Sequence, residues 1–158
     1  MKKKLLSSII TIALVAASSF PATAYNGSGQ TGPVYHLEKE SNDSRVNAND
    51  MSNLPGTSNG HASMVGILGN VRAGDTDFYK VGGEEAAKYY SNINIHASNV
   101  SDFITYDLVD ANGNPTPIKP GSTIELDVSK GQEYYIRATT GSSQSDFDYS
   151  ITAYRIFK

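Results

Sequence analysis

Apolar and polar side chains alternate along much of the chain beyond residue 60. The clearest run is DFDYSITAYRIF, residues 146–157, in which Phe147, Tyr149, Ile151 and Ala153 fall on one side. Successive side chains of a strand point to opposite faces, so a run of this kind buries one face and leaves the other in water. The pattern predicts half-buried β-strands and restricts the chain to folds in which sheets pack by one face.

Six other short runs are alternating or apolar, and turn-forming stretches separate them. The runs are MVGILGNV (64–71), DFYKV (77–81), YYSNINIHA (89–97), DFITYDLVD (102–110), STIELDVS (122–129) and QEYYIRAT (132–139). The stretches are DANGNPTPIKPG (110–121), SKGQ (129–132) and TTGSSQ (139–144). Short strands spaced in this way are typical of an all-β, antiparallel sandwich.

The expected core of this sandwich consists of the apolar side chains on one face of each run. These are Ile93, Ile95, Ile104, Tyr106, Leu108, Ile124, Leu126, Ile136, Tyr149 and Ile151. One short N-terminal helix is expected over residues 44–53, SRVNANDMSN, with Asp43 or Ser44 as its cap. GGEEAAK, residues 82–88, is interpreted as a charged loop. DANGN, residues 110–114, is interpreted as a hairpin turn, because its glycine is fourth rather than sixth as in an EF-hand.

The N-terminus predicts export. Three lysines follow Met1, residues 5–17 are mostly apolar, and Ala22-Thr23-Ala24 gives the A-x-A pattern of a signal-peptidase site. We expect a signal peptide over residues 1–24, cleavage after Ala24 and secretion of a soluble monomer; an uncleaved anchor is the alternative. Residues 25–35 are expected to form a flexible leader before a domain over residues 36–158.

The net charge and the cysteine content restrict the classes of binding partner and the means by which the fold can be stabilised. Without the three leader lysines, 10 of the 13 cationic side chains remain against 16 carboxylates, a formal charge of −6. A negative domain of this kind favours neither nucleic acid nor an anionic membrane as partner. The chain has no cysteine, so no disulfide framework is available, and a structural metal would be a useful substitute.

Two acidic clusters raise the question of a bound cation. In LEKESNDSRVNAND, residues 37–50, an extended backbone would place Glu38, Glu40 and Asn42 on one face, and a turn would bring Asp43 to join them. AGDTD, residues 73–77, adds two carboxylates at the start of a strand. Two interpretations remain open for the first cluster: a solvated segment that caps the short helix, or a site for Ca²⁺, which takes six to eight oxygen ligands.

The order of these motifs resembles the bacterial pre-peptidase C-terminal domain. The resemblance rests on E-x-E-x-N-D (38–43), A-x-x-M (48–51), VGILGNVRAGDTDFYKV (65–81), FITYDLVDANGN (103–114), KGQEYYIRAT (130–139) and DYSITA (148–153), and it covers about residues 36–156. It implies a jelly-roll-like β-sandwich related to the collagen-binding domains of clostridial collagenases. Calcium-binding members use the matching acidic positions, which implicates as ligands Glu38, Glu40, Asn42, Asp43, Asp75 and Asp77.

The resemblance also implies a function without catalysis. The leading hypothesis is a secreted binding or accessory module for an extracellular protein or polymer. The alternative is a partner, inhibitor or stabiliser of a separately encoded secreted protease; an enzyme is the third class, although no catalytic motif marks a nucleophile. Tyr90 and Tyr135 are weak candidates for a ligand-binding face, since each belongs to a pair of adjacent tyrosines in a predicted strand.

Overall fold

The computed structural model describes residues 32–98, 101–141 and 146–158. Strands make up most of this part of the chain, and its helical elements are η1 (Arg45–Asn47) and α1 (Glu84–Tyr89). The strands are β1 (Val34–Leu37), β2 (Asn49–Asp50), β3 (Thr57–Ser58), β4 (Ala62–Val71), β5 (Thr76–Gly82), β6 (Tyr90–Ala97), β7 (Ile104–Asp110), β8 (Pro115–Ile118), β9 (Thr123–Asp127), β10 (Glu133–Thr140) and β11 (Phe147–Phe157). Neither helix of the described residues has the length and apolar character needed to cross a membrane.

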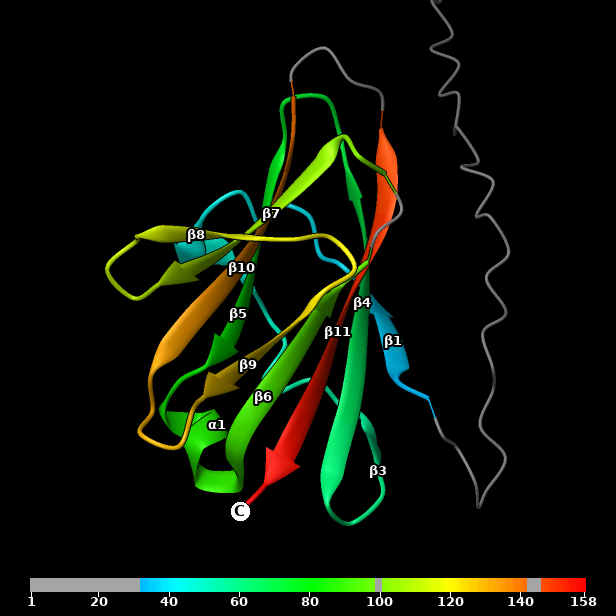
Figure 1. Ribbon diagram of the computed structural model, residues 1–158. Coiled ribbons are helices and arrows are strands. Elements are labelled where there is room, and N and C mark those ends of the chain that lie inside the picture. The colour runs from blue at the N-terminus through cyan, green and yellow to red at the C-terminus, as the bar shows by residue number, and fades with distance from the viewer. Residues whose placement is uncertain (1–31, 99–100, 142–145) are drawn as a thin grey trace, which may run out of the picture. The chain divides into compact units, whose positions relative to one another are not determined.

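Two sheets pack face to face, which confirms the expected all-β sandwich (Figure 1). One sheet has the order β1-β4-β11-β6-β9 with β3 also paired to β4, and the other has the order β2-β5-β10-β7-β8. Strands β4 to β7 and β9 to β11 alternate between the two sheets, as in a jelly roll, and β7 and β8 form a hairpin. Most pairs are antiparallel; the short strands β1 and β2 pair in parallel with β4 and β5.

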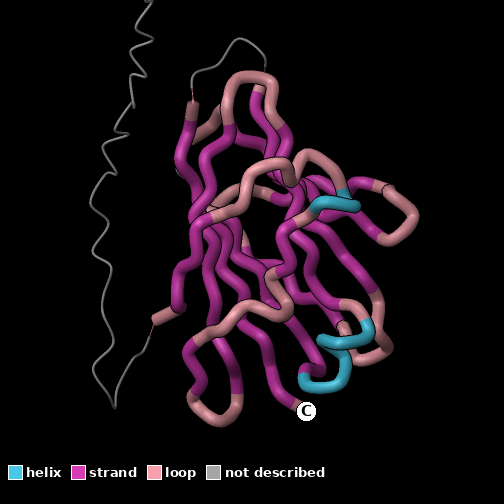
Figure 2. Tube along the Cα trace, turned by 180° about the vertical axis from the view of Figure 1, so that it is seen from behind, coloured by secondary structure: helices cyan, strands magenta, loops and turns pink. Residues whose placement is uncertain are grey.

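The last strand along the chain lies inside its sheet. β11 pairs with β4 from Phe147 to Ile156 and with β6 from Ile151 to Phe157, both antiparallel. Figure 1 shows the red β11 between the green β4 and β6. Viewed from behind, the strands run through both layers and the two helical segments lie at the margin of the sandwich (Figure 2).

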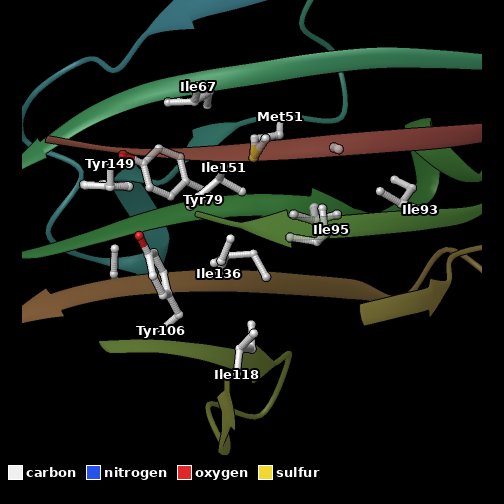
Figure 3. Packing of buried hydrophobic residues seen from close by; sticks show 14 of the residues in the cluster. Met51, Ile67, Tyr79, Ile93, Ile95, Tyr106, Ile118, Ile136, Tyr149 and Ile151 are labelled. Atoms are coloured by element: carbon white, nitrogen blue, oxygen red, sulfur yellow. Dashed lines mark hydrogen bonds between the residues drawn. The ribbon is translucent and has the colours of Figure 1, made fainter. Parts of the chain in front are cut away.

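The core contains the side chains that alternation predicts. Of the ten expected core residues, eight are at most 5% exposed, and Leu108 and Ile124 are partly buried against the same cluster. Figure 3 shows isoleucines from both sheets interdigitating, with the labelled tyrosines Tyr79, Tyr106 and Tyr149 towards one end. Burial of these apolar groups is the main stabilising contribution, about 25 cal/mol per Å².

The positions of the helices correct two expectations. The short N-terminal helix expected over residues 44–53 forms only as the 3₁₀ turn η1, residues 45–47; Ser44 makes no side-chain cap, and Asn49–Asp50 pair with β5. The expected charged loop at residues 82–88 is instead largely helix α1, whose sequence EEAAKY is rich in good helix formers. The leader boundary also moves, because β1 begins at Val34, inside residues 25–35.

A buried arginine joins the segment after β2 to β11. Arg155 is 2% exposed, and its guanidinium donates to the carbonyl oxygens of Ser52 at 2.9 Å and Leu54 at 2.8 Å and to Ser63 Oγ at 2.6 Å. The same group lies 5.3 Å from the centre of the Tyr90 ring. Carbonyl oxygens and a ring face replace water around the charge, so residues 52–54 are held against the sheet.

Candidate metal site

The backbone brings the two acidic clusters together at one end of the sandwich. Because β1 pairs with β4, the end of β1 lies beside Leu68 of β4. The carbonyl oxygen of Leu68 accepts the Glu38 N–H at 3.0 Å. Four residues later the Asn42 carbonyl accepts the Phe78 N–H at 2.9 Å, next to the start of β5. Residues 38–42 therefore lie alongside residues 75–78, which are more than 30 positions further along the chain.

Three carboxylates converge where these segments meet. One oxygen each from Glu40, Asp75 and Asp77 lies within 4.8 Å of the other two. Asp77 is fully buried, Asp75 is half-buried and Glu40 is exposed, so the group opens from the interior towards water. Burial raises the pKa of Asp77 to about 7; the contact with Tyr149 opposes this rise, and the charges of Glu38, Asp75 and Glu40 add to it.

Three buried side-chain atoms at this place, from Asn42 and Asp77, lack hydrogen-bond partners among the described residues. Asn42 is 0% exposed and neither its amide oxygen nor its amide nitrogen is hydrogen-bonded; the same holds for Oδ1 of Asp77. A buried polar atom without a partner costs about 1–3 kcal/mol, so folded proteins rarely keep several together. Carboxylate and amide oxygens are the donors that Ca²⁺ prefers, so the residues present fit this ion.

Glu38 has a different role from that expected. Its Oε1 accepts the Asn70 N–H, and its Oε2 contacts the Tyr79 hydroxyl. The Tyr79 hydroxyl in turn contacts that of Tyr149, which lies 2.8 Å from Asp77 Oδ2. Glu38 is thus linked to Asp77 through two tyrosines, and it is not one of the three carboxylates that converge.

The two hydroxyls in the chain of contacts Glu38–Tyr79–Tyr149–Asp77 donate to the carboxylates at its ends: Tyr79 donates to Glu38, and Tyr149 donates to Asp77. Burial raises the pKa of both tyrosines, so both stay protonated. Burial also raises the pKa of Asp77 to about 7, so above that pH the buried site carries an additional negative charge.

The remaining predicted residues fall outside this group. Asp43 is exposed, and Ser41, with φ of 74°, turns the backbone between Glu40 and Asn42, so the segment is not the extended one expected. Tyr135 is 8% exposed and its hydroxyl donates to Glu133; Tyr90 packs on Phe157 and against Arg155. Contacts within the protein therefore occupy the rings of both ligand-binding candidates.

The tyrosine pair is the part of the site that sequence reasoning missed. Tyr79 and Tyr149 occupy inward-facing positions of β5 and β11 and are therefore indistinguishable from core residues by pattern. The closeness of their hydroxyls depends on the packing of one sheet on the other, in which the rings meet edge to face at 6.2 Å. No short-range signal in the sequence carries that information.

The fold and site thus define an all-β sandwich with an acidic, partly buried group at one end. No protein-family model and no curated protein sequence matches the chain. Among solved structures, it is similar to the periplasmic g-type lysozyme inhibitor PliG of Aeromonas hydrophila (10% identity, TM-score 0.44, covering 65% of this chain and 91% of that one). It is also similar to an RmlC-like cupin protein of Desulfovibrio desulfuricans (12%, 0.42, 63% and 76%). At these values the similarities carry no argument about function.

Proposed function

We propose that the chain is a secreted, non-catalytic binding module of the pre-peptidase C-terminal type, stabilised by Ca²⁺ and directed at an extracellular protein or polymer. The observation that supports it best is the unsatisfied buried oxygen of Asp77 beside the carboxylates of Glu40 and Asp75. A cation at this place would give that oxygen a partner and would offset the repulsion among the acidic groups.

Glu40, Asp75 and Asp77 would hold the ion, with the Asn42 amide oxygen as a further ligand. Ca²⁺ tolerates irregular geometry and takes several oxygens at about 2.3–2.6 Å, whereas Mg²⁺ demands a regular octahedron and keeps its waters. A donor set of oxygens only, partly open to solvent, therefore favours Ca²⁺ over Mg²⁺ and over transition metals, which prefer nitrogen or sulfur.

The role of the ion would be structural. It would join the segment after β1 to the start of β5, and the tyrosine chain behind it fixes Asp77 and Glu38 in place. Among the described residues, His36 contacts the Pro55 carbonyl oxygen at 2.7 Å and His96 lies beside Thr123, so these two imidazoles make their contacts away from the acidic group.

Thermal unfolding with EGTA or with millimolar Ca²⁺ tests the metal. We expect Ca²⁺ to raise the unfolding midpoint of the wild-type protein. The corresponding gain in the free energy of unfolding is about 2.7 kcal/mol at a hundredfold excess of Ca²⁺ over Kd. The double variant Glu40→Gln/Asp75→Asn keeps the shape of the side chains and should lose this response. The exposed Glu125→Gln on β9 is a control with a charge change elsewhere and should respond like wild type. Equal midpoints in EGTA and Ca²⁺ for wild type would refute the calcium site.

The partner is tested separately by affinity capture from spent culture medium, with the calcium-loaded protein as bait. Retention of one extracellular protein or of a cell-surface polymer would support the binding module. Capture of an active secreted protease would support the alternative role of partner, inhibitor or stabiliser. Turnover of a substrate that a single point substitution abolishes would overturn the non-catalytic proposal.

A further inference from the structure

The strands at the margins of the two sheets differ in how their free edges are protected. β1 and β9 are the outermost strands of one sheet, and β2 and β8 are those of the other. An edge strand presents backbone N–H and C=O groups on its outer side, and soluble proteins block such an edge with proline, charge or a covering segment. Three of these four edges carry a block of this kind, and β1 is the exception.

Proline and charge block two of the edges. β8 contains Pro115 and Pro117, which have no N–H to offer to a neighbouring strand. β9 presents the carboxylates of Glu125 and Asp127, which are both exposed. An incoming strand would therefore lose hydrogen bonds at β8 and would meet negative charge at β9.

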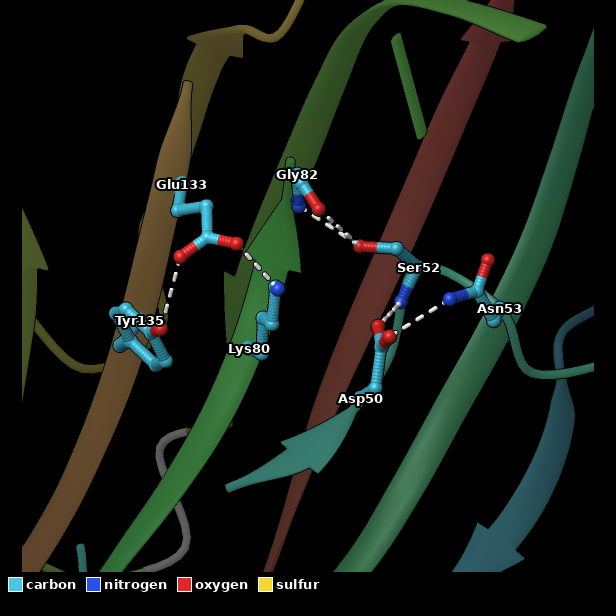
Figure 4. A network of polar contacts seen from close by, with 7 residues as sticks. All are labelled: Asp50, Ser52, Asn53, Lys80, Gly82, Glu133 and Tyr135. Atoms are coloured by element: carbon cyan, nitrogen blue, oxygen red, sulfur yellow. Dashed lines mark hydrogen bonds and ion pairs between the residues drawn. The ribbon is translucent and has the colours of Figure 1, made fainter. Parts of the chain in front are cut away.

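The edge of β2 is engaged by the protein itself. The side chain of Asn49 accepts the Lys39 N–H at 3.0 Å and donates to the Lys39 carbonyl oxygen at 2.9 Å. Asp50 accepts the Ser52 N–H at 2.8 Å and the Asn53 amide at 2.7 Å, which holds the chain in a turn directly after the strand (Figure 4). Both residues of β2 are thus bound by segments of their own chain in addition to β5.

The outer side of β1 carries none of these protections. Its sequence, VYHL, contains neither proline nor a carboxylate. The Glu38 N–H bonds to Leu68 of β4, and alternate residues of a strand turn their backbone groups to the same side, so the N–H and C=O groups of Tyr35 and Leu37 face away from β4. The side chains of these two residues are 48% and 80% exposed. Outward-facing backbone groups and exposed apolar side chains therefore occur together at this edge.

The edge of β1 is complementary to itself. In an antiparallel ladder every second pair of opposing residues exchanges two N–H···O=C bonds. If two copies of β1 pair about a two-fold axis at His36, Tyr35 of each copy lies opposite Leu37 of the other, and these are the residues whose backbone groups face outward. Their side chains share one face, so a ring would pack on an aliphatic side chain twice. The Tyr35 ring already lies against Gly66, where an added Cβ would be 2.5 Å from it, so its orientation is set before association.

We propose that two copies of this chain associate through β1, whose strands pair antiparallel about a two-fold axis at His36 and join two sheets into one. A second copy is the occupant that satisfies the outward groups of Tyr35 and Leu37 with the sequence already present, and a contact of this symmetry closes at a dimer. The dimer would replace the monomer expected from the sequence. It goes beyond the calcium site, because none of the proposed ligands lies in β1.

The association should be weak and reversible. A ladder of four residues from each copy is smaller than the interface of about 1,200 Å² that stable complexes bury. We therefore expect a Kd in the micromolar to millimolar range. Such a dimer would form where the protein is concentrated, for example along an extracellular polymer, and two linked copies would then hold that polymer more firmly than one.

Single cysteines test the register, because the chain has none of its own. At the two-fold axis the Cα atoms of the two residues 36 would lie about 4.5 Å apart, within the range that a disulfide bridges. The two residues 37 would lie on a diagonal, about 7–8 Å apart, which is too far. In a glutathione buffer His36→Cys should therefore form a covalent dimer about tenfold or more faster than Leu37→Cys, as measured by non-reducing electrophoresis.

Side-chain exposure alone gives the opposite order. Leu37 is 80% exposed and Val46, on η1 beside the other sheet, is 94% exposed, whereas His36 is half-buried. Random collisions would therefore oxidise Leu37→Cys and Val46→Cys first. Rates that follow exposure in this way would overturn the proposal.

Sedimentation velocity over a series of concentrations tests the protein without cysteines, in a buffer with Ca²⁺ so that the segment after β1 is in the same state in every sample. We expect the mean mass of wild type to rise towards that of a dimer. Leu37→Lys places at this edge the charge that other edge strands use for protection, and it should weaken association about tenfold or more. Val46→Lys adds the same charge at another exposed apolar position and should associate like wild type. A wild type that stays monomeric at millimolar concentration, or an equal loss in both lysine variants, would overturn the dimer.

Discussion

The hydroxyl of Tyr149 lies 2.8 Å from the carboxylate of Asp77, although 71 residues separate them in the sequence. Tyr149 belongs to β11 of one sheet and Asp77 to β5 of the other, so this contact crosses the interior of the sandwich. It places a polar link between the sheets at the end where the acidic segments meet. The stability of the core and the electrostatics of the candidate metal site therefore depend on the same hydroxyl.

Removing this hydroxyl should be costly. Tyr149→Phe keeps the ring but takes a partner from both Asp77 and Tyr79, and we expect the free energy of unfolding to fall by about 1–3 kcal/mol. Denaturant unfolding monitored by circular dichroism measures it. Tyr154→Phe, on the exposed side of the same strand, is the matched control and should change stability by less than about 0.5 kcal/mol. Similar losses in both variants would contradict the role of the buried link.

Without calcium, stability should fall as the pH rises from about 4 to about 7. The pKa of Asp77 is raised to about 7 from 3.8, so in this window the folded protein binds a proton that the unfolded chain does not. The stabilisation is present in full below the unfolded pKa and is lost as the pH passes the folded one, with an upper bound of about 4 kcal/mol. Unfolding free energies in EGTA across this range give the slope.

Asp77→Asn isolates that contribution. The amide stays neutral at every pH, so the difference in stability between variant and wild type in EGTA should shift in favour of the variant as the pH rises towards 8. The same substitution removes a charged ligand and should abolish stabilisation by Ca²⁺. A constant difference across the pH range would show that Asp77 is not the group that binds the proton.

Two glycines of β4 provide a graded test of packing. A Cβ at Gly69 would collide with the buried rings of Tyr149 and Tyr79, whereas one at Gly66 would meet Tyr35, which is 48% exposed on the edge strand β1. Gly69→Ala should cost about 1–3 kcal/mol, as overpacking does, and Gly66→Ala clearly less, because Tyr35 can move into solvent. Thermal unfolding of the two variants measures the difference. The reverse order would contradict the packing at this end of the core.

Arg155 should be among the most sensitive positions. Arg155→Met fills part of the same volume but leaves the carbonyl oxygens of Ser52 and Leu54 and the hydroxyl of Ser63 without their donor, and we expect a loss of about 2–5 kcal/mol. Hydrogen exchange should localise the effect to residues 51–55. Arg72→Met removes an exposed guanidinium and should be nearly neutral. A comparable loss for both variants would argue against the buried network.

The alternation of apolar and polar residues was sufficient to predict most of the strands of the fold. Alternation in β6, β10 and β11 identified their inward faces, because the period of a strand fixes which side chains meet the core. It failed between residues 44 and 53, where pairing of Asn49 and Asp50 with β5 overrides weak helical tendencies. It also failed at α1, where two glycines with positive φ release the chain from β5 and permit a helical turn.

The candidate site was predictable in composition but not in arrangement. The acidic clusters around Glu40 and Asp77 are visible in the sequence, and the structure brings them together. The engagement of Glu38 by Tyr79 and Asn70, and the turn at Ser41 that leaves Asp43 outside, follow from the register of β1 on β4 and from the packing of the two sheets. Such relationships join residues far apart in sequence, so no local signal encodes them.

The position of β11 within its sheet has a consequence for how the protein is made. β11 is the strand that joins β4 to β6, so the two parts of this sheet stay separate until residues 147–157 pair with both of them. Contacts between such distant segments also form slowly, because a long loop must close first. A chain with this topology is expected to fold more slowly than one whose sheets are built from strands adjacent in the sequence. The order of strands thus predicts a slow final folding step, in which β11 enters between β4 and β6.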